Sequence, residues 1–94
     1  MVIGVLSIEL EIAQANSLKE KRMVVNRVRD LLRRKFNVAV AEVESLNVWN
    51  HAGLAVVAVS NEQKFCNQVL SQAVNLLEAD QDGYVLGEVG MEFL

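Results

Sequence analysis

Six segments of the chain carry the periodic apolar patterns of strands and helices. Residues 2–12 begin apolar and then alternate with polar residues, the period of two that marks a half-buried strand. Residues 18–35 and 62–79 instead place apolar residues every three or four positions, which is typical of amphipathic helices. Short apolar runs predict three further strands, at 38–44, 54–59 and 84–93.

The predicted order is therefore β-α-β-β-α-β. Two right-handed strand–helix–strand units of this kind place both helices on one face of a four-stranded antiparallel sheet. We therefore predict a single α+β domain over residues 1–94, a ferredoxin-like sandwich. The other sheet face should be open, with Ser7, Glu9 and Glu11 pointing outward.

Short local signals mark the predicted helix ends. Ser17 and Glu20 have the spacing of a capping box at the start of the first helix. Asn37 is a candidate left-handed stop at its end. Ser60 and Gln63 repeat the capping-box spacing before the second helix.

The last strand contains two glycines, Gly87 and Gly90, which indicate a bulge or a close backbone approach. The stretch 45–53 is mostly polar and predicts a loop. One face of the last strand is predicted to carry Val85, Val89, Met91 and Phe93.

Composition narrows the class of protein. Apolar residues make up 52% of the chain, and the only cysteine, Cys66, excludes an internal disulfide. No apolar run reaches the roughly 20 residues of a membrane span, and the chain opens directly into a strand pattern rather than a signal peptide. We expect a cytoplasmic protein with no membrane partner.

The net charge of −3 conceals a strong asymmetry. Eight of the nine basic residues lie between Lys19 and Lys35, and that segment carries +6 because it also contains Glu20 and Asp30. The rest of the chain carries −9. Charge concentrated in one segment is informative about partners rather than about fold.

The first helical turn is a candidate anion site made of Ser17, Lys19, Lys21 and Arg22. A helix N-terminus offers free N–H donors and the positive end of the helix dipole, so cations placed there need a reason. Lys21 falls on the predicted apolar face. Its amine either holds an anion, reaches water along a buried stem, or pairs with an acidic neighbour.

A basic stripe of Lys19, Arg22, Arg29 and Arg33 runs along the same helix. Eighteen helical residues span about 27 Å, long enough to follow several phosphates of an RNA backbone. A solvated charged face is the alternative. Arg33, Arg34 and Lys35 also suit the negative end of the helix dipole without any ligand.

Other reactive residues form no recognisable catalytic set. His51 is the only histidine and has no serine or cysteine nucleophile beside it in sequence, so an ordinary loop residue is expected. Cys66 falls on the apolar stripe of the second helix. The strand glutamates Glu9, Glu11, Glu42 and Glu44 could gather on one sheet region and bind a cation. They lack a metal-ligand signature, however, and a solvated strand face is expected. We predict no catalytic residue, no metal and no cofactor.

Several stretches resemble the YlxP-like family, small bacterial proteins classed as a domain of unknown function. They are Met1–Leu6, Ser17-Leu18-Lys19-Glu20-Lys21-Arg22, Phe36–Val43, Trp49 and Ala58–Asn61, and the resemblance covers nearly the whole chain. It implies a ferredoxin-like fold, a cytoplasmic bacterial protein and a gene neighbourhood shared with translation and ribosome-maturation factors. It implies no activity and supplies no functional residues.

Two functions remain. The first is a non-enzymatic protein that binds ribosomal RNA or a ribosome-assembly factor through the basic helix, with Ser17, Lys19, Lys21, Arg22, Arg29 and Arg33 as the contacting residues. The second is a homodimer or larger oligomer that uses the open sheet face for self-association or for a small metabolite. A phosphate-ester reaction at Lys21 and Arg22 ranks third, because no base or nucleophile is identifiable.

Overall fold

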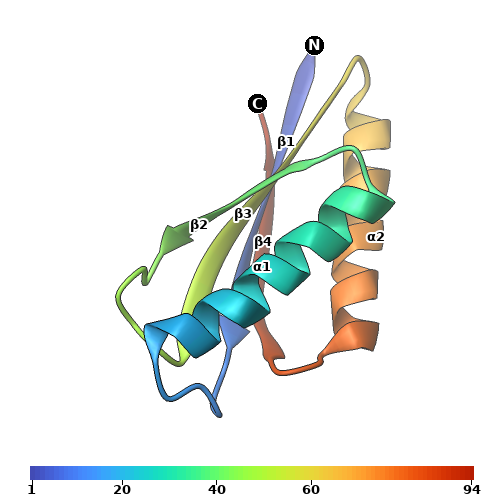
Figure 1. Cartoon of the computed structure of the whole chain (residues 1–94). Helices are drawn as coiled ribbons and strands as arrows, with labels where there is room; N and C mark the ends of the chain where they lie inside the picture. The colour runs from blue at the N-terminus through green and yellow to red at the C-terminus, as the bar shows by residue number, and fades with distance from the viewer.

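The computed structural model describes all residues from 1 to 94 and contains the six predicted elements in order (Figure 1). They are β1 (Val2–Glu11), α1 (Leu18–Lys35), β2 (Ala39–Glu44), β3 (His51–Ser60), α2 (Gln63–Asp80) and β4 (Val85–Phe93). The strands form one antiparallel sheet in the order β2-β3-β1-β4. The predicted ferredoxin-like α+β architecture is confirmed.

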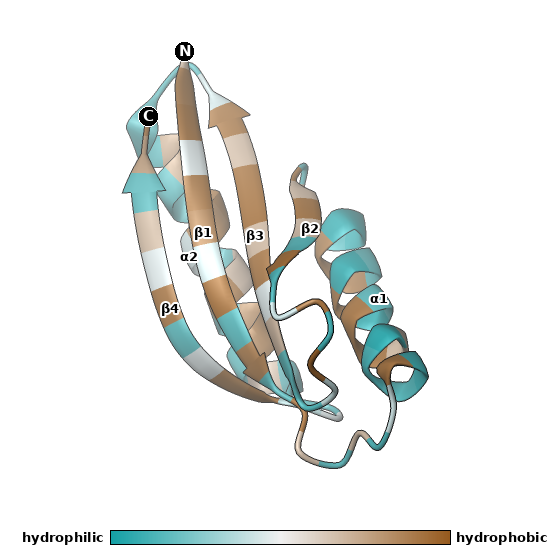
Figure 2. Ribbon diagram, turned by 90° about the vertical axis from the view of Figure 1, so that its left-hand side faces the viewer, coloured by the Kyte–Doolittle hydropathy of each residue, from teal (hydrophilic) through white to brown (hydrophobic).

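The two helices divide one face of the sheet between them. α2 packs on β1, β3 and β4, whereas α1 packs on β2 and β3. Strand alternation directs the apolar side chains of the sheet toward the two helices. Leu6, Ile8 and Leu10 of β1 are fully buried there, together with Leu54 and Val56 of β3. The opposite face of the sheet is uncovered (Figure 2).

The start of α1 follows the predicted cap. Ser17 is the N-cap, and its Oγ accepts the backbone N–H of Glu20 at 3.1 Å. The Glu20 carboxylate reaches back, but it accepts the N–H of Asn16 rather than that of Ser17. The predicted left-handed stop at Asn37 is wrong. The helix ends at Phe36 in an extended conformation, with the Phe36 N–H bonded to the carbonyl of Leu32.

The second predicted capping box is also wrong. The N-cap of α2 is Glu62, which makes no side-chain capping bond. Ser60 Oγ accepts the N–H of Glu62 at 3.2 Å, two residues on, so the hydroxyl closes a local turn instead of reaching into the helix.

A bulge divides β4. Leu86 pairs with Leu10 and Val89 with Ile8, so two residues of β4, Gly87 and Glu88, face Glu9 alone. A Cβ on Gly87 would lie 3.3 Å from both the Cβ and the carbonyl oxygen of Glu9, which confirms the predicted close approach there. The bulge reverses alternation. Val85 therefore lies on the open face and not with Val89, Met91 and Phe93, as was predicted.

β3 begins at His51, three residues before the predicted strand. His51, Ala52 and Gly53 pair with Glu11, Leu10 and Glu9 of β1. The local sequence is too polar to predict this start, because the pairing depends on a strand forty residues away.

A cluster around Tyr84 joins α1 to the end of α2. Arg27 Nη1 donates to Asp80 Oδ2 at 3.0 Å, and the Tyr84 hydroxyl lies 3.0 Å from both that oxygen and the Leu77 carbonyl. Burial raises the pKa of Tyr84, and its hydrogen bond to Asp80 raises it further. Burial alone would raise the pKa of Asp80, but the hydrogen bonds from Arg27 and Tyr84 outweigh it and leave that pKa below its usual value.

Replacing Asp80 by asparagine should lower the free energy of unfolding by about 1–2 kcal/mol at neutral pH, because a charge-assisted bond is lost. A depressed carboxyl pKa stabilises the fold above the unfolded-state value of 3.8. The loss in unfolding free energy caused by Asp80→Asn should therefore be largest at neutral pH. It should shrink as the pH falls through the pKa of Asp80 in the folded protein. Denaturant unfolding across this range measures it, and a deficit that does not change with pH would contradict the assignment.

Candidate functional site

The predicted basic stripe lies on the exposed flank of α1. Lys19, Arg22 and Arg33 are exposed, and none of them makes an ion pair with an acidic side chain. Arg29 continues the row and lies with its Nε 3.4 Å from Asp30. One helix positions all four side chains, because spacings of three and four residues bring them to the same side.

A groove separates this stripe from the edge strand β2. It has a volume of about 380 Å³, with Arg22, Asn26 and Arg29 on the helix side and Val40, Ala41 and Glu42 on the strand side. The groove therefore joins two guanidinium groups to the free edge of a strand.

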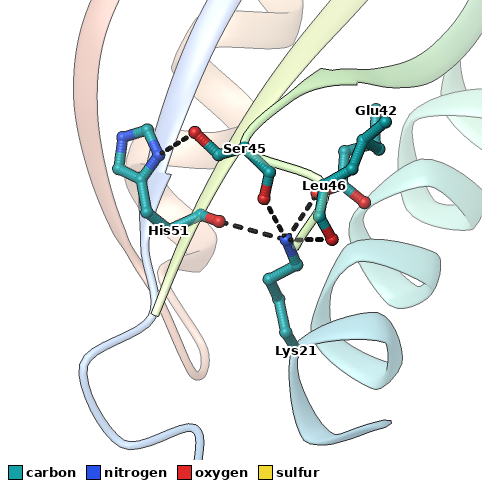
Figure 3. Close-up of polar contacts among 5 residues, drawn as sticks. All are labelled: Lys21, Glu42, Ser45, Leu46 and His51. Atoms are coloured by element: carbon teal, nitrogen blue, oxygen red, sulfur yellow. Dashed lines mark hydrogen bonds and ion pairs between the residues drawn. The ribbon is translucent and has the colours of Figure 1, made fainter. Parts of the chain in front are cut away.

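Lys21 does not belong to this surface. Its side chain is fully buried, and Nζ lies 2.7 Å from Glu42 Oε2 (Figure 3). Nζ also donates to the backbone carbonyls of Ser45 at 2.7 Å, His51 at 3.2 Å and Leu46 at 3.4 Å. An ammonium group has three donors, so protein acceptors occupy all of them.

Of the three alternatives for Lys21, the structure thus favours pairing with an acidic neighbour. Ser17 is occupied as the helix cap. The four candidate residues of the first turn are therefore not brought together around one point: Lys21 points inward, whereas Lys19 and Arg22 point to solvent. Lys21 is therefore not part of the exposed basic surface of α1.

The Lys21–Glu42 pair also changes the electrostatics of the groove. Glu42 Oε2 is buried and accepts no hydrogen bond, so the ion pair with the Lys21 amine is its one charged contact. The Glu42 side chain is 14% exposed. Lys21 thus neutralises the only carboxylate that lines the groove beside Arg22 and Arg29. This leaves the groove with a net positive charge.

A second cluster lies on the open sheet face, and the sequence did not predict that His51 joins Glu9 and Glu11 there. His51 Nε2 lies 3.6 Å from Glu9 Oε2 and 3.5 Å from Glu11 Oε1. Its Nδ1 lies 3.2 Å from Ser45 Oγ, so a serine does stand beside this histidine, six residues away across the β2–β3 loop. The loop-residue expectation for His51 is wrong, because the residue opens β3. Cys66 is buried as predicted.

Fold and sequence together identify the class of protein. Residues 3–88 match the family described as "Protein of unknown function (DUF503)", and the chain belongs to this family. It is similar to "Uncharacterized protein YlxP" of Bacillus subtilis (strain 168), with 30% identity over 78 residues. The match covers 83% of this chain and 85% of the relative, and it confirms the YlxP-like resemblance. Neither helix is long and apolar enough to cross a membrane.

Replacing Lys21 by methionine should destabilise the fold by about 3 kcal/mol, because the Glu42 carboxylate and three carbonyls lose their shared donor. Adding Glu42→Gln should restore part of the loss, since it removes the uncompensated charge. Denaturant unfolding of the two single variants and the double variant measures the coupling. Lys19→Met, on the exposed side of the same turn, is the control and should change stability little. Equal stabilities of Lys21→Met and Lys19→Met would contradict this role.

Proposed function

We propose that the protein is a non-enzymatic binding protein associated with ribosome maturation or translation, and that it contacts RNA through α1. The observation that carries the proposal is the row Lys19, Arg22, Arg29 and Arg33. In a chain with an excess of acidic residues, three of these four cations have no acidic partner. Such a row is the electrostatic footprint expected of a surface that binds phosphates.

The ion pairs of the fold support this interpretation. They engage Lys21 with Glu42 and Arg27 with Asp80, which are the two basic residues of α1 that face other elements. Lys19, Arg22, Arg29 and Arg33 share one side of the helix, away from these two contacts. Meanwhile Glu9, Glu11, Glu44 and Glu88 lie on or beside the open sheet face, away from α1. This separation of charge leaves Asp30 as the one acidic side chain that pairs with the stripe, at Arg29.

The groove beside the stripe supports a single-stranded target. A phosphate backbone lying along α1 would meet Arg22 and Arg29, and Asn26 between them offers an amide for a base or a sugar. Guanidinium groups bind phosphate oxygens through paired N–H donors, which favours the arginines as anchors.

Co-sedimentation with ribosomal subunits over a range of salt concentrations tests the proposal. The Arg22→Gln/Arg29→Gln/Arg33→Gln variant should bind more weakly than wild type, and its slope of log affinity against log salt should be shallower by about 2. The matched control is Gln68→Glu/Gln72→Glu/Asn75→Asp on exposed positions of α2, which makes the same change in net charge.

The proposal predicts that only the α1 variant loses binding. Equal affinity of wild type and the α1 variant would overturn it. Equal losses in the two variants would indicate a dependence on net charge alone. Binding that survives nuclease treatment of the particles would assign an acidic protein, rather than RNA, as the partner.

A second candidate function is self-association through the open sheet face. One half of that face is apolar: Ile3 pairs with Val59, Val5 pairs with Val57, and Val59 is 62% exposed. A two-fold axis through this half would bury the valines and carry the acidic ends of the two copies apart.

Sedimentation velocity over a series of protein concentrations tests this candidate. Wild type should shift toward a dimer as concentration rises, and Val57→Lys/Val59→Lys should remain a monomer because two buried charges would oppose the interface. Gln68→Lys/Gln72→Lys on α2 makes the same charge change and should leave the dimer intact. A wild-type monomer throughout the micromolar range would count against the candidate.

A further inference from the structure

Two glutamates and the only histidine of the chain converge at one end of the open sheet face. Glu9 and Glu11 are two residues apart on β1, so strand alternation places them on the same side. His51 is the direct cross-strand partner of Glu11, and Gly53 is the partner of Glu9. The β1–β3 pairing is unbroken over these residues and positions the three side chains on one face. A Cβ on Gly53 would lie 2.8 Å from Glu44 Cβ, so the glycine lets the edge strand β2 approach beside the cluster.

The distances within this cluster do not suit a hydrogen-bonded ion pair. Charge-assisted bonds of this type run about 2.7–2.9 Å between nitrogen and oxygen. His51 Nε2 instead lies 3.5 and 3.6 Å from one oxygen of each glutamate. These values are close to the edge of a coordination tetrahedron, about 3.4 Å for ligands at about 2.1 Å from a central ion. The three ligand atoms all lie within 4.8 Å of one another.

The imidazole is held in the orientation that a metal ligand requires. Ser45 Oγ lies 3.2 Å from Nδ1 (Figure 3). This contact holds the ring with its other nitrogen, Nε2, on the side of Glu9 and Glu11. Lys21 in turn holds the carbonyls of both Ser45 and His51 from the other side of the loop. Ligating histidines characteristically use their second nitrogen in this way.

The electrostatic surroundings favour a cation. No lysine or arginine pairs with Glu9 or Glu11. An adjoining hollow of about 400 Å³ on the same face is lined by Glu9, Glu44 and Glu88. The carboxylates of Glu9, Glu11, Glu44 and Glu88 thus share one surface, and no lysine or arginine forms an ion pair with any of them. Their negative potential raises the local concentration of divalent cations.

We propose that Glu9, Glu11 and His51 bind a first-row transition-metal dication such as Zn²⁺. One imidazole nitrogen and two carboxylate oxygens form a ligand set that Zn²⁺ and Co²⁺ accept, whereas Mg²⁺ and Ca²⁺ prefer oxygen alone. Three protein ligands leave at least one position open toward solvent, where an oxygen or nitrogen donor of a partner can bind. The site lies on a different surface from the basic stripe and shares none of its side chains.

Calorimetric titration of the whole protein with Zn²⁺, and visible absorption with Co²⁺ as the probe, test the site. We expect one equivalent to bind and the Co²⁺ spectrum to show the intense bands of a low-coordinate ion. His51→Gln and Glu11→Gln should each weaken binding by at least about tenfold. His51→Gln preserves the backbone carbonyl that Lys21 holds, so it should fold, and circular dichroism verifies this.

Glu44→Gln and Glu88→Gln remove neighbouring carboxylates that are not among the three proposed ligands. They should leave the Zn²⁺ affinity within about threefold of wild type, because these carboxylates affect the ion only through long-range electrostatics. Zn²⁺ binding that is equal in wild type and His51→Gln would overturn the proposal, as would preference for Mg²⁺ over Zn²⁺. The Arg22→Gln/Arg29→Gln/Arg33→Gln variant should bind Zn²⁺ with wild-type affinity. Failure of the RNA proposal can therefore be distinguished from failure of the metal-site proposal.

Discussion

The Lys21 amine connects more of this domain than any other polar group. It joins the first turn of α1 to β2 through Glu42, to the β2–β3 connection through the Ser45 and Leu46 carbonyls, and to the start of β3 through the His51 carbonyl. α1 packs on two strands, one of which is a six-residue edge strand, and it reaches the end of α2 through Arg27. The connection also contains Ser45, whose φ of 62° lies in the left-handed region that disfavours a side chain. A bond to the Ser45 carbonyl compensates for that conformation and positions the side chain for His51. The contacts of the Lys21 amine thus position both the basic helix and His51.

Placing a lysine at the centre of this contact has a cost that an apolar residue would avoid. Removing a charged pair from water is expensive, and well-packed apolar replacements are often equally stable. The Lys21–Glu42 pair adds specificity of position, because the Lys21 amine has to meet oxygens from β2, from the β2–β3 connection and from β3 at the same time. In a domain of this size, with no disulfide and little surface to bury, such a polar contact can define how a helix and a loop meet.

Local patterns were sufficient to predict the fold but not the candidate sites. The apolar periods of β1 and of both helices identified the elements, and the Ser17 cap could be predicted because its donor is only three residues away. By contrast, the partners of Lys21 lie 21 to 30 residues along the chain, beyond any local signal. The convergence of His51 on Glu9 and Glu11 depends on strand register, and the extension of β3 to His51 cannot be read from a polar stretch. Arg27 belongs to the same basic segment, but its contacts with Asp80, the Asp82 carbonyl and the Tyr84 ring depend on residues more than fifty positions away. The exposed stripe was predictable because helical spacing alone determines which side it occupies.

The separation of charge also gives the molecule an electric dipole, with its positive end at α1 and its negative end at the acidic half of the sheet. Such a dipole exerts a torque in the field of a polyanion before any contact forms. A chain whose net charge is −3 would be repelled as a point charge, but a dipole of this kind would turn the helix toward a polyanion during an approach. The same rotation points the open sheet face away from the polyanion. A molecule docked by its helix therefore leaves that face accessible to solvent, to ions and to further protein.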